Sequence, residues 1–155
     1  MFRIWKTRRA RKVAVSTILP FVTRSRAARE IPDSLWFDPY FVGYIGMLIT
    51  LTASWKGSGL GTDDLASVQS QSWATITGLR GELIGDEICS LSAAHDERFE
   101  LGCRNALAFF QALQSDTAPD LYPGMADDPE REKKAALWAR HFDSYVSEYM
   151  TVYMR

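Results

Sequence analysis

The amino-acid sequence predicts an all-α protein, a single-domain bundle of four or five helices with a basic N-terminal helical segment. Apolar residues recur at steps of three and four along most of the 155 residues, which is the period of an amphipathic helix. No stretch alternates strictly between apolar and polar residues, as a half-buried strand would. We divide the chain into the basic segment, residues 1–30, and the helical bundle domain, residues 31–155.

Half of the basic residues lie in the first segment. Residues 1–30 contain nine Lys and Arg and one acid, a net charge of +8, whereas the rest of the chain has a net charge of −9. We expect a helix that breaks near Pro20, because proline lacks the N–H that a helix interior needs. A cleaved export signal is the second interpretation, but basic residues instead of a small-residue cleavage site follow the apolar run at 13–22. A cytoplasmic location is therefore expected, at the inner face of a membrane if lipid is the partner.

Residues 39–55 predict an uncharged helix. Asp38 is its expected N-cap, and Pro39 suits its first turn. The seventeen residues without a charge are only just long enough for a membrane span. Two glycines and three hydroxyl side chains make the segment poorly hydrophobic, so a core helix is favoured over a span.

The next predicted helix covers residues 63–90. Thr62 or Asp63 is the expected cap, and apolar residues follow at helical steps. Gly78 and two later glycines weaken the second half, because glycine costs about 1 kcal/mol relative to alanine inside a helix. We expect a kink or a break there.

Two more helices are expected, over residues 92–114 and from Pro129 to the C-terminus, joined by a loop at 116–127. Aromatic residues at helical spacing line one face of the last helix: Trp138, Phe142, Tyr145, Tyr149 and Tyr153. Residues four apart on a helix lie above one another, so this strip is expected to pack against the helix at 39–55. At its Tyr153 end, core packing and an interface of a homo-oligomer through the C-terminal helix both stay open.

No complete catalytic or metal-binding pattern occurs in the sequence. His95-x-Glu97 matches half of a zinc-deaminase site, but the Pro-Cys-x-x-Cys half is absent. Cys103 lies on an apolar stripe, where a thiol is a small core residue more often than a nucleophile. We therefore predict no catalytic residues, no metal and no cofactor.

The basic segment is the feature that predicts a partner. The candidate partner-binding residues are Trp5, Arg8, Arg9, Arg11, Lys12, Arg24, Arg26 and Arg29. Basic residues with apolar ones between them are typical of a helix at a membrane interface, where arginine reaches phosphate. Nucleic acid is a weaker candidate, because no recognition motif occurs and the rest of the chain is acidic. The basic segment lying across its own acidic domain is the intramolecular alternative.

These observations predict a non-enzymatic helical protein whose basic N-terminal segment docks on an acidic partner, either an anionic membrane surface or a protein assembly. The alternative is an enzyme or small-ligand-binding protein with a pocket among the helices near His95. Aromatic side chains would line that pocket and His95 and Glu87 would be its polar groups; the aromatics are Tyr40, Tyr44, Trp73, Trp138, Tyr145 and Tyr149.

Overall fold

The computed structural model describes residues 1–55, 59–115 and 129–154. The described part is all-α, as predicted, and forms a single domain of six helices when the last three segments are counted as one. The elements are α1 (Phe2–Ala28), η1 (Asp33–Phe37), α2 (Pro39–Ser54), α3 (Thr62–Thr77), α4 (Ile84–Ala93), α5 (Glu97–Gln114), α6 (Pro129–Trp138), the π-helical turn η2 (Ala139–Asp143) and α7 (Ser144–Tyr153). The predicted loop at 116–127 lies outside the described residues.

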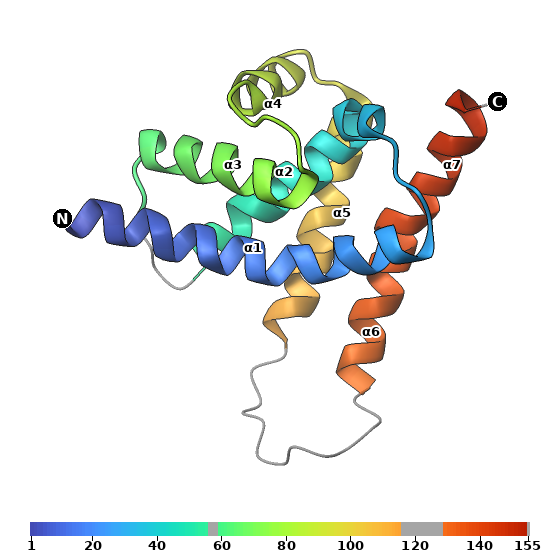
Figure 1. The fold of residues 1–155 in the computed structure, drawn as a ribbon, viewed down its shortest axis with the longest axis horizontal. Coiled ribbons are helices and arrows are strands. Elements are labelled where there is room, and N and C mark those ends of the chain that lie inside the picture. The colour runs from blue at the N-terminus through green and yellow to red at the C-terminus, as the bar shows by residue number, and fades with distance from the viewer. Residues whose placement is uncertain (56–58, 116–128, 155) are drawn as a thin grey trace.

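Helix α1 is continuous through Pro20, so the predicted break is wrong. Pro20 removes one backbone hydrogen bond, but its ring lies on the exposed side of the helix. The opposite side is held by burial, because Ala14, Ile18 and Val22 are fully buried at steps of four residues. Helix α1 therefore belongs to the same core as the rest of the chain, and it packs along α3 and α2 (Figure 1).

Helix α2 is the centre of the fold. The Asp38 side chain accepts a hydrogen bond from the Tyr40 amide at 3.0 Å, which confirms the predicted N-cap. The helix packs most extensively on α5, and the two backbones touch: a Cβ added at Gly102 would lie 2.2 Å from the Tyr40 carbonyl oxygen. The residues of α2 are mostly buried, as predicted for a core helix. Within the described ranges, no helix is long and apolar enough to cross a membrane.

The predicted helix at 63–90 is two helices. Gly78 ends α3 with a φ of 77°, a left-handed conformation that glycine adopts without strain, so a break replaces the kink. At the other end, the N-cap position is Gly61, and neither Thr62 nor Asp63 caps the helix. The predicted start of the next helix at Ser92 is also wrong, because Ser92 belongs to the end of α4.

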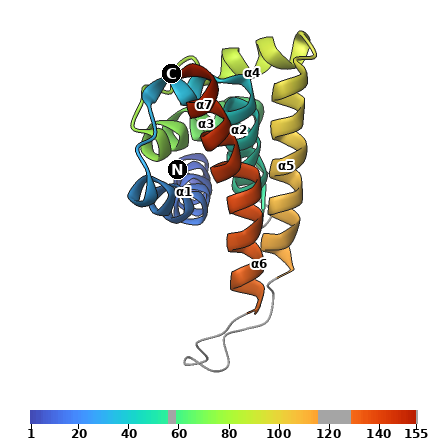
Figure 2. The same ribbon diagram turned by 90° about the vertical axis from the view of Figure 1, so that its right-hand side faces the viewer.

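A sharp corner joins α4 to α5. His95 has a φ of 50° there, and Asp96 caps α5 by accepting from the Phe99 amide at 2.9 Å. Both Figure 1 and Figure 2 show α4 at the edge of the molecule, with α3 between it and α1 in the first view. This corner is therefore separated from α1 by the bundle.

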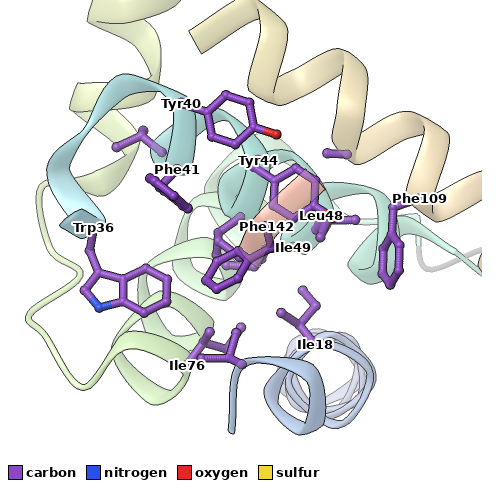
Figure 3. Close-up of a cluster of buried hydrophobic side chains, with 14 of the residues drawn as sticks. Ile18, Trp36, Tyr40, Phe41, Tyr44, Leu48, Ile49, Ile76, Phe109 and Phe142 are labelled. Atoms are coloured by element: carbon purple, nitrogen blue, oxygen red, sulfur yellow. The ribbon is translucent and has the colours of Figure 1, made fainter. Parts of the chain in front are cut away.

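The C-terminal helix packs its aromatic strip against α2, as predicted. The Tyr145 and Tyr40 rings stack with centroids 3.8 Å apart, and Phe142 meets Phe41 edge-on at 5.4 Å. Farther along, the Tyr149 hydroxyl donates to Ser34 Oγ at 2.9 Å. Figure 3 shows Phe142 in the middle of the buried cluster, with side chains of α1 and α2 around it. Tyr153 is 62% exposed, so the strip leaves the core at its last turn.

Candidate functional site

The basic residues at the C-terminal end of α1 are bound to the protein itself. The guanidinium of Arg26 donates to the carbonyls of Ile76 and Thr77, at 3.0 and 2.8 Å, where α3 ends. These carbonyls have no intrahelical donor, and the negative end of the α3 dipole favours a cation there. The same guanidinium lies 5.4 Å from the centre of the Trp36 ring. Arg26 therefore holds α1 on α3.

Arg29 and Ser25 attach α1 to the C-terminal helix. Arg29 donates to the Asp143 carbonyl and to Ser147 Oγ. The buried Ser25 hydroxyl donates to the Asp143 carboxylate at 2.6 Å and accepts from the Trp138 indole at 2.9 Å. Arg26 and Arg29 are among the residues predicted from the sequence to bind a partner. In the structure, both make contacts within the chain.

The basic residues nearer the N-terminus are mostly unpaired. Arg3 forms an ion pair with Asp64 at 2.5 Å, and Arg11 donates to Gln71 at 2.7 Å, both on α3. Five further basic side chains make neither a hydrogen bond nor an ion pair with any described residue: Lys6, Arg8, Arg9 and Lys12 near the N-terminus, and Arg24 near the other end of α1. Contact between the basic segment and its own acidic domain therefore accounts for only part of the charge of that segment. Apolar packing, rather than ion pairing, holds most of α1 on the other helices.

Exposed apolar side chains gather at the same end of α1. Phe2 is 79% exposed and Trp5 57% exposed, and together with Met1 they line a small hollow. The Arg9 guanidinium lies over the Trp5 ring at 5.4 Å. We call this end the α1 tip; it consists of Met1, Phe2, Ile4, Trp5, Lys6, Arg8, Arg9 and Lys12. The tip combines a solvated apolar surface with adjacent unpaired cations.

A larger hollow continues along α1 from the tip. It has a volume of about 990 Å³, is open to solvent and is lined by Arg8, Arg11, Lys12, Val15, Ser16, Leu19, Pro20 and Thr23 of α1 and by Thr75 of α3. The sequence interpretation placed only the basic members of this set at the site. The apolar members could have been found from spacing, because Lys12, Val15 and Leu19 share one side of a helix.

A group of acidic residues lies on another side of the molecule. Residues 81–100, which form α4 and its corner with α5, carry six acidic residues and one arginine. Figure 1 places this region across α3 from α1. The unpaired cations of α1 and this acidic group therefore lie on separate surfaces, which gives the described part of the protein a polarised charge.

The residues of the alternative pocket do not come together around His95. The predicted aromatics fill the core, where Tyr40 and Tyr44 are fully buried and Trp73 almost so, while Tyr145 is partly buried. Burial raises the pKa of Tyr44 well above its ordinary value, so its phenol stays neutral. In contrast, His95 and Glu87 are exposed, and His95 contacts Glu100 at 3.3 Å.

Two features of the described residues bear on catalysis, the Cys103 thiol and the grouping of metal-ligating side chains. Burial raises the pKa of the Cys103 thiol to about 11, so the nucleophilic thiolate is scarce at neutral pH. Over the same ranges, no group of three or more His, Cys, Asp or Glu side chains is placed to hold a metal ion. Comparison with known proteins found no matching family model, no matching curated protein and no matching solved structure.

Proposed function

We propose that this chain is a non-enzymatic helical protein that docks on an anionic membrane surface through the α1 tip. The observation that carries the proposal is the exposure of Phe2 and Trp5 beside the unpaired cations Arg8 and Lys12. Aromatic rings are favoured at the depth of lipid headgroups, and basic side chains near an anionic leaflet contribute about 1 kcal/mol each.

The apolar part of the tip favours lipid over an acidic protein as the partner. Met1, Phe2 and Trp5 form a small hollow at the end of a helix, and the larger hollow beside it is open to solvent along α1. A membrane interface receives such side chains without needing a matching shape. Failure to bind either kind of vesicle would instead favour docking on an acidic protein assembly.

The charge distribution favours one orientation on the membrane. With the α1 tip on the lipid, the acidic region at 81–100 lies across α3 and away from the negative surface. Because the attraction is screened within about 10 Å at ordinary ionic strength, the distant acids oppose docking only weakly. We place the docked protein at the cytoplasmic face of the membrane.

The test is co-sedimentation of the full-length protein with vesicles of phosphatidylcholine and phosphatidylglycerol, against vesicles of phosphatidylcholine alone. Deleting residues 1–30 would remove Ile18 and Val22 from the core, so the variant is the double substitution Arg8→Glu and Lys12→Glu. Reversing two charges is expected to weaken binding at least about a hundredfold.

The matched control is Arg131→Glu with Arg140→Glu, which makes the same change in net charge at exposed sites on α6 and η2. This control should bind nearly as the original protein does. Equal loss in both variants would mean that net charge alone matters, and binding to neither vesicle would exclude the membrane as the partner.

Trp5 provides a second readout, because it is the exposed tryptophan of the five: Trp36, Trp73 and Trp138 are almost fully buried and Trp55 is partly buried. Binding to anionic vesicles should shift the tryptophan emission to shorter wavelength as the Trp5 ring leaves water. The substitution Trp5→Phe should abolish most of this shift and weaken binding by no more than about threefold, because phenylalanine keeps the apolar contact. An unchanged shift in Trp5→Phe would show that the tip stays in water.

A further inference from the structure

The large hollow on α1 has two chemically different ends. Arg8, Arg11 and Lys12 surround the end nearer the tip, and Val15, Leu19 and Pro20 line the rest. Its volume of about 990 Å³ is at the upper end of the range for small-molecule sites, which is roughly 300–1,000 Å³. Charge at one end and apolar surface at the other fit an amphipathic anion.

The apolar residues of the hollow are not used by the core. Val15 and Leu19 are partly exposed and belong to neither of the two buried clusters of the described chain. The buried side of α1 is formed instead by Ala14, Ile18 and Val22. Val15 and Leu19 therefore present apolar surface that a ligand can cover without disturbing the fold.

The basic end is partly preorganised. Gln71 accepts from the Arg11 guanidinium at 2.7 Å and donates to Ser67 Oγ at 2.9 Å, which fixes Arg11 between α1 and α3. Arg8 and Lys12 have no partner among the described residues and are free to complete the contact. Three cations thus converge where a phosphate would be bound.

A second, smaller hollow shares this basic end. It has a volume of about 330 Å³ and lies between α1 and α3, lined by Ile4, Thr7, Arg8, Arg11, Ser67, Val68 and Gln71. Its hydroxyl and amide side chains can exchange hydrogen bonds with a hydroxyl group. Arg8 and Arg11 therefore stand between a polar hollow and an apolar one.

We propose that α1 holds one molecule of an anionic phospholipid whose headgroup carries hydroxyls. The phosphate lies at Arg8, Arg11 and Lys12, the headgroup hydroxyls point toward Thr7 and Ser67, and one acyl chain follows Val15 and Leu19. The inference rests on the proposed membrane docking, since the open side of the hollow leaves the second chain in the bilayer. Free phosphate would leave the apolar end uncovered.

The test uses lysophosphatidylglycerol, a soluble single-chain probe, below its micelle concentration. It is titrated into the full-length protein and followed by amide chemical shifts. Shifts are expected along residues 8–23, and Leu19→Gln should weaken binding about tenfold by removing apolar contact. Glycerol phosphate, which has the headgroup without the chain, should bind at least about tenfold more weakly than the lipid.

Two variants separate this inference from membrane docking. Leu19→Gln alters the hollow and leaves the tip intact, whereas Phe2→Ser with Trp5→Ser alters the tip and leaves the hollow intact. We expect Leu19→Gln to keep most vesicle binding and the tip variant to keep most lysolipid binding. Val15→Thr, which nearly preserves shape, gives the same comparison if Leu19→Gln is unfolded by circular dichroism.

Equal affinity of the original protein and both hollow variants for the lysolipid would overturn the inference, even if vesicles are bound. Equal affinity for glycerol phosphate and for the lysolipid would also overturn it, because the site would then be a simple anion site. Loss of vesicle binding in the tip variant alone, with the lysolipid still bound, would support both proposals separately.

Discussion

Both halves of α1 contain arginines, but these arginines have different surroundings. Near the C-terminal end, Arg26 and Arg29 donate to carbonyls of other helices, and Ser25 is buried in a hydrogen-bonded cluster. Near the N-terminal end, Arg8 and Lys12 make no hydrogen bond or ion pair with the rest of the described chain. The net charge of +8 in residues 1–30 therefore does not tell which basic side chains are available to a partner.

Packing explains why the halves differ. From Ala14 onward, α1 contributes to the main core, chiefly through Ile18 and Val22, whereas its earlier turns meet a small separate cluster through Ala10. An alanine contact buries little surface, so the first turns of α1 remain largely solvated. The half that stabilises the fold and the half with most of the unpaired cations are therefore separated along one helix.

The largest effect is expected from a matched pair of isoleucines. Ile18 is fully buried and Ile4 is 58% exposed, both on α1. Ile18→Ala should lower the free energy of unfolding by about 2–5 kcal/mol, because it removes buried methyl groups and leaves a cavity. Ile4→Ala should change it by less than about 0.5 kcal/mol. Chemical denaturation of the two variants measures both values, and equal losses would remove the distinction between the halves.

A matched pair of arginines gives a smaller effect. Arg26→Ala should lower the free energy of unfolding by about 1–3 kcal/mol, because it leaves the Ile76 and Thr77 carbonyls without their charged donor. Arg24→Ala, at an exposed site without a described partner, should change it by less than about 0.5 kcal/mol. The measurement is again denaturation at neutral pH. If Arg26→Ala is as stable as the original protein, the contacts of Arg26 do not stabilise the fold, and Arg26 belongs with the cations that are free for docking.

The smallest effect is expected on the pH dependence of stability, through His141. This residue lies in η2, close in sequence to Asp143, which binds Ser25 and Arg29 of the N-terminal segment. Burial lowers the pKa of His141, and the neighbouring Arg140 lowers it further. Since the unfolded chain then binds a proton more readily than the folded one, stability should fall as the pH drops below about 6.5. His141→Gln should flatten this part of the profile. Thermal unfolding across this pH range compares the variant with the original protein, and identical profiles for the two would contradict the expectation.

Much of the fold was predictable because local signals agree with packing. Asp38 before Pro39 identified the start of α2, and the spacing of Phe142 and Tyr145 identified the face that meets it. The start of α5 was misplaced because the corner depends on His95 in a left-handed conformation, for which a non-glycine residue gives no sequence signal. Pro20 was misread because tertiary contacts outweighed its local preference.

The site was predictable only in part. The sequence identified the basic residues, but separating Arg26 from Arg8 requires knowing that α3 ends beside Arg26. That contact joins residues fifty positions apart in the chain, so the sequence pattern of α1 alone does not indicate it. The exposure of Phe2 and Trp5 likewise depends on what the other helices leave uncovered.

The polarised charge has a consequence for the protein in dilute salt without lipid. One copy presents unpaired cations on α1, and another presents the acidic region at 81–100 on a different surface. Such a contact joins unlike surfaces, so it does not close on itself as a two-fold dimer does and can add further copies head to tail. Added salt screens these charges, so it should separate the head-to-tail assemblies into single molecules.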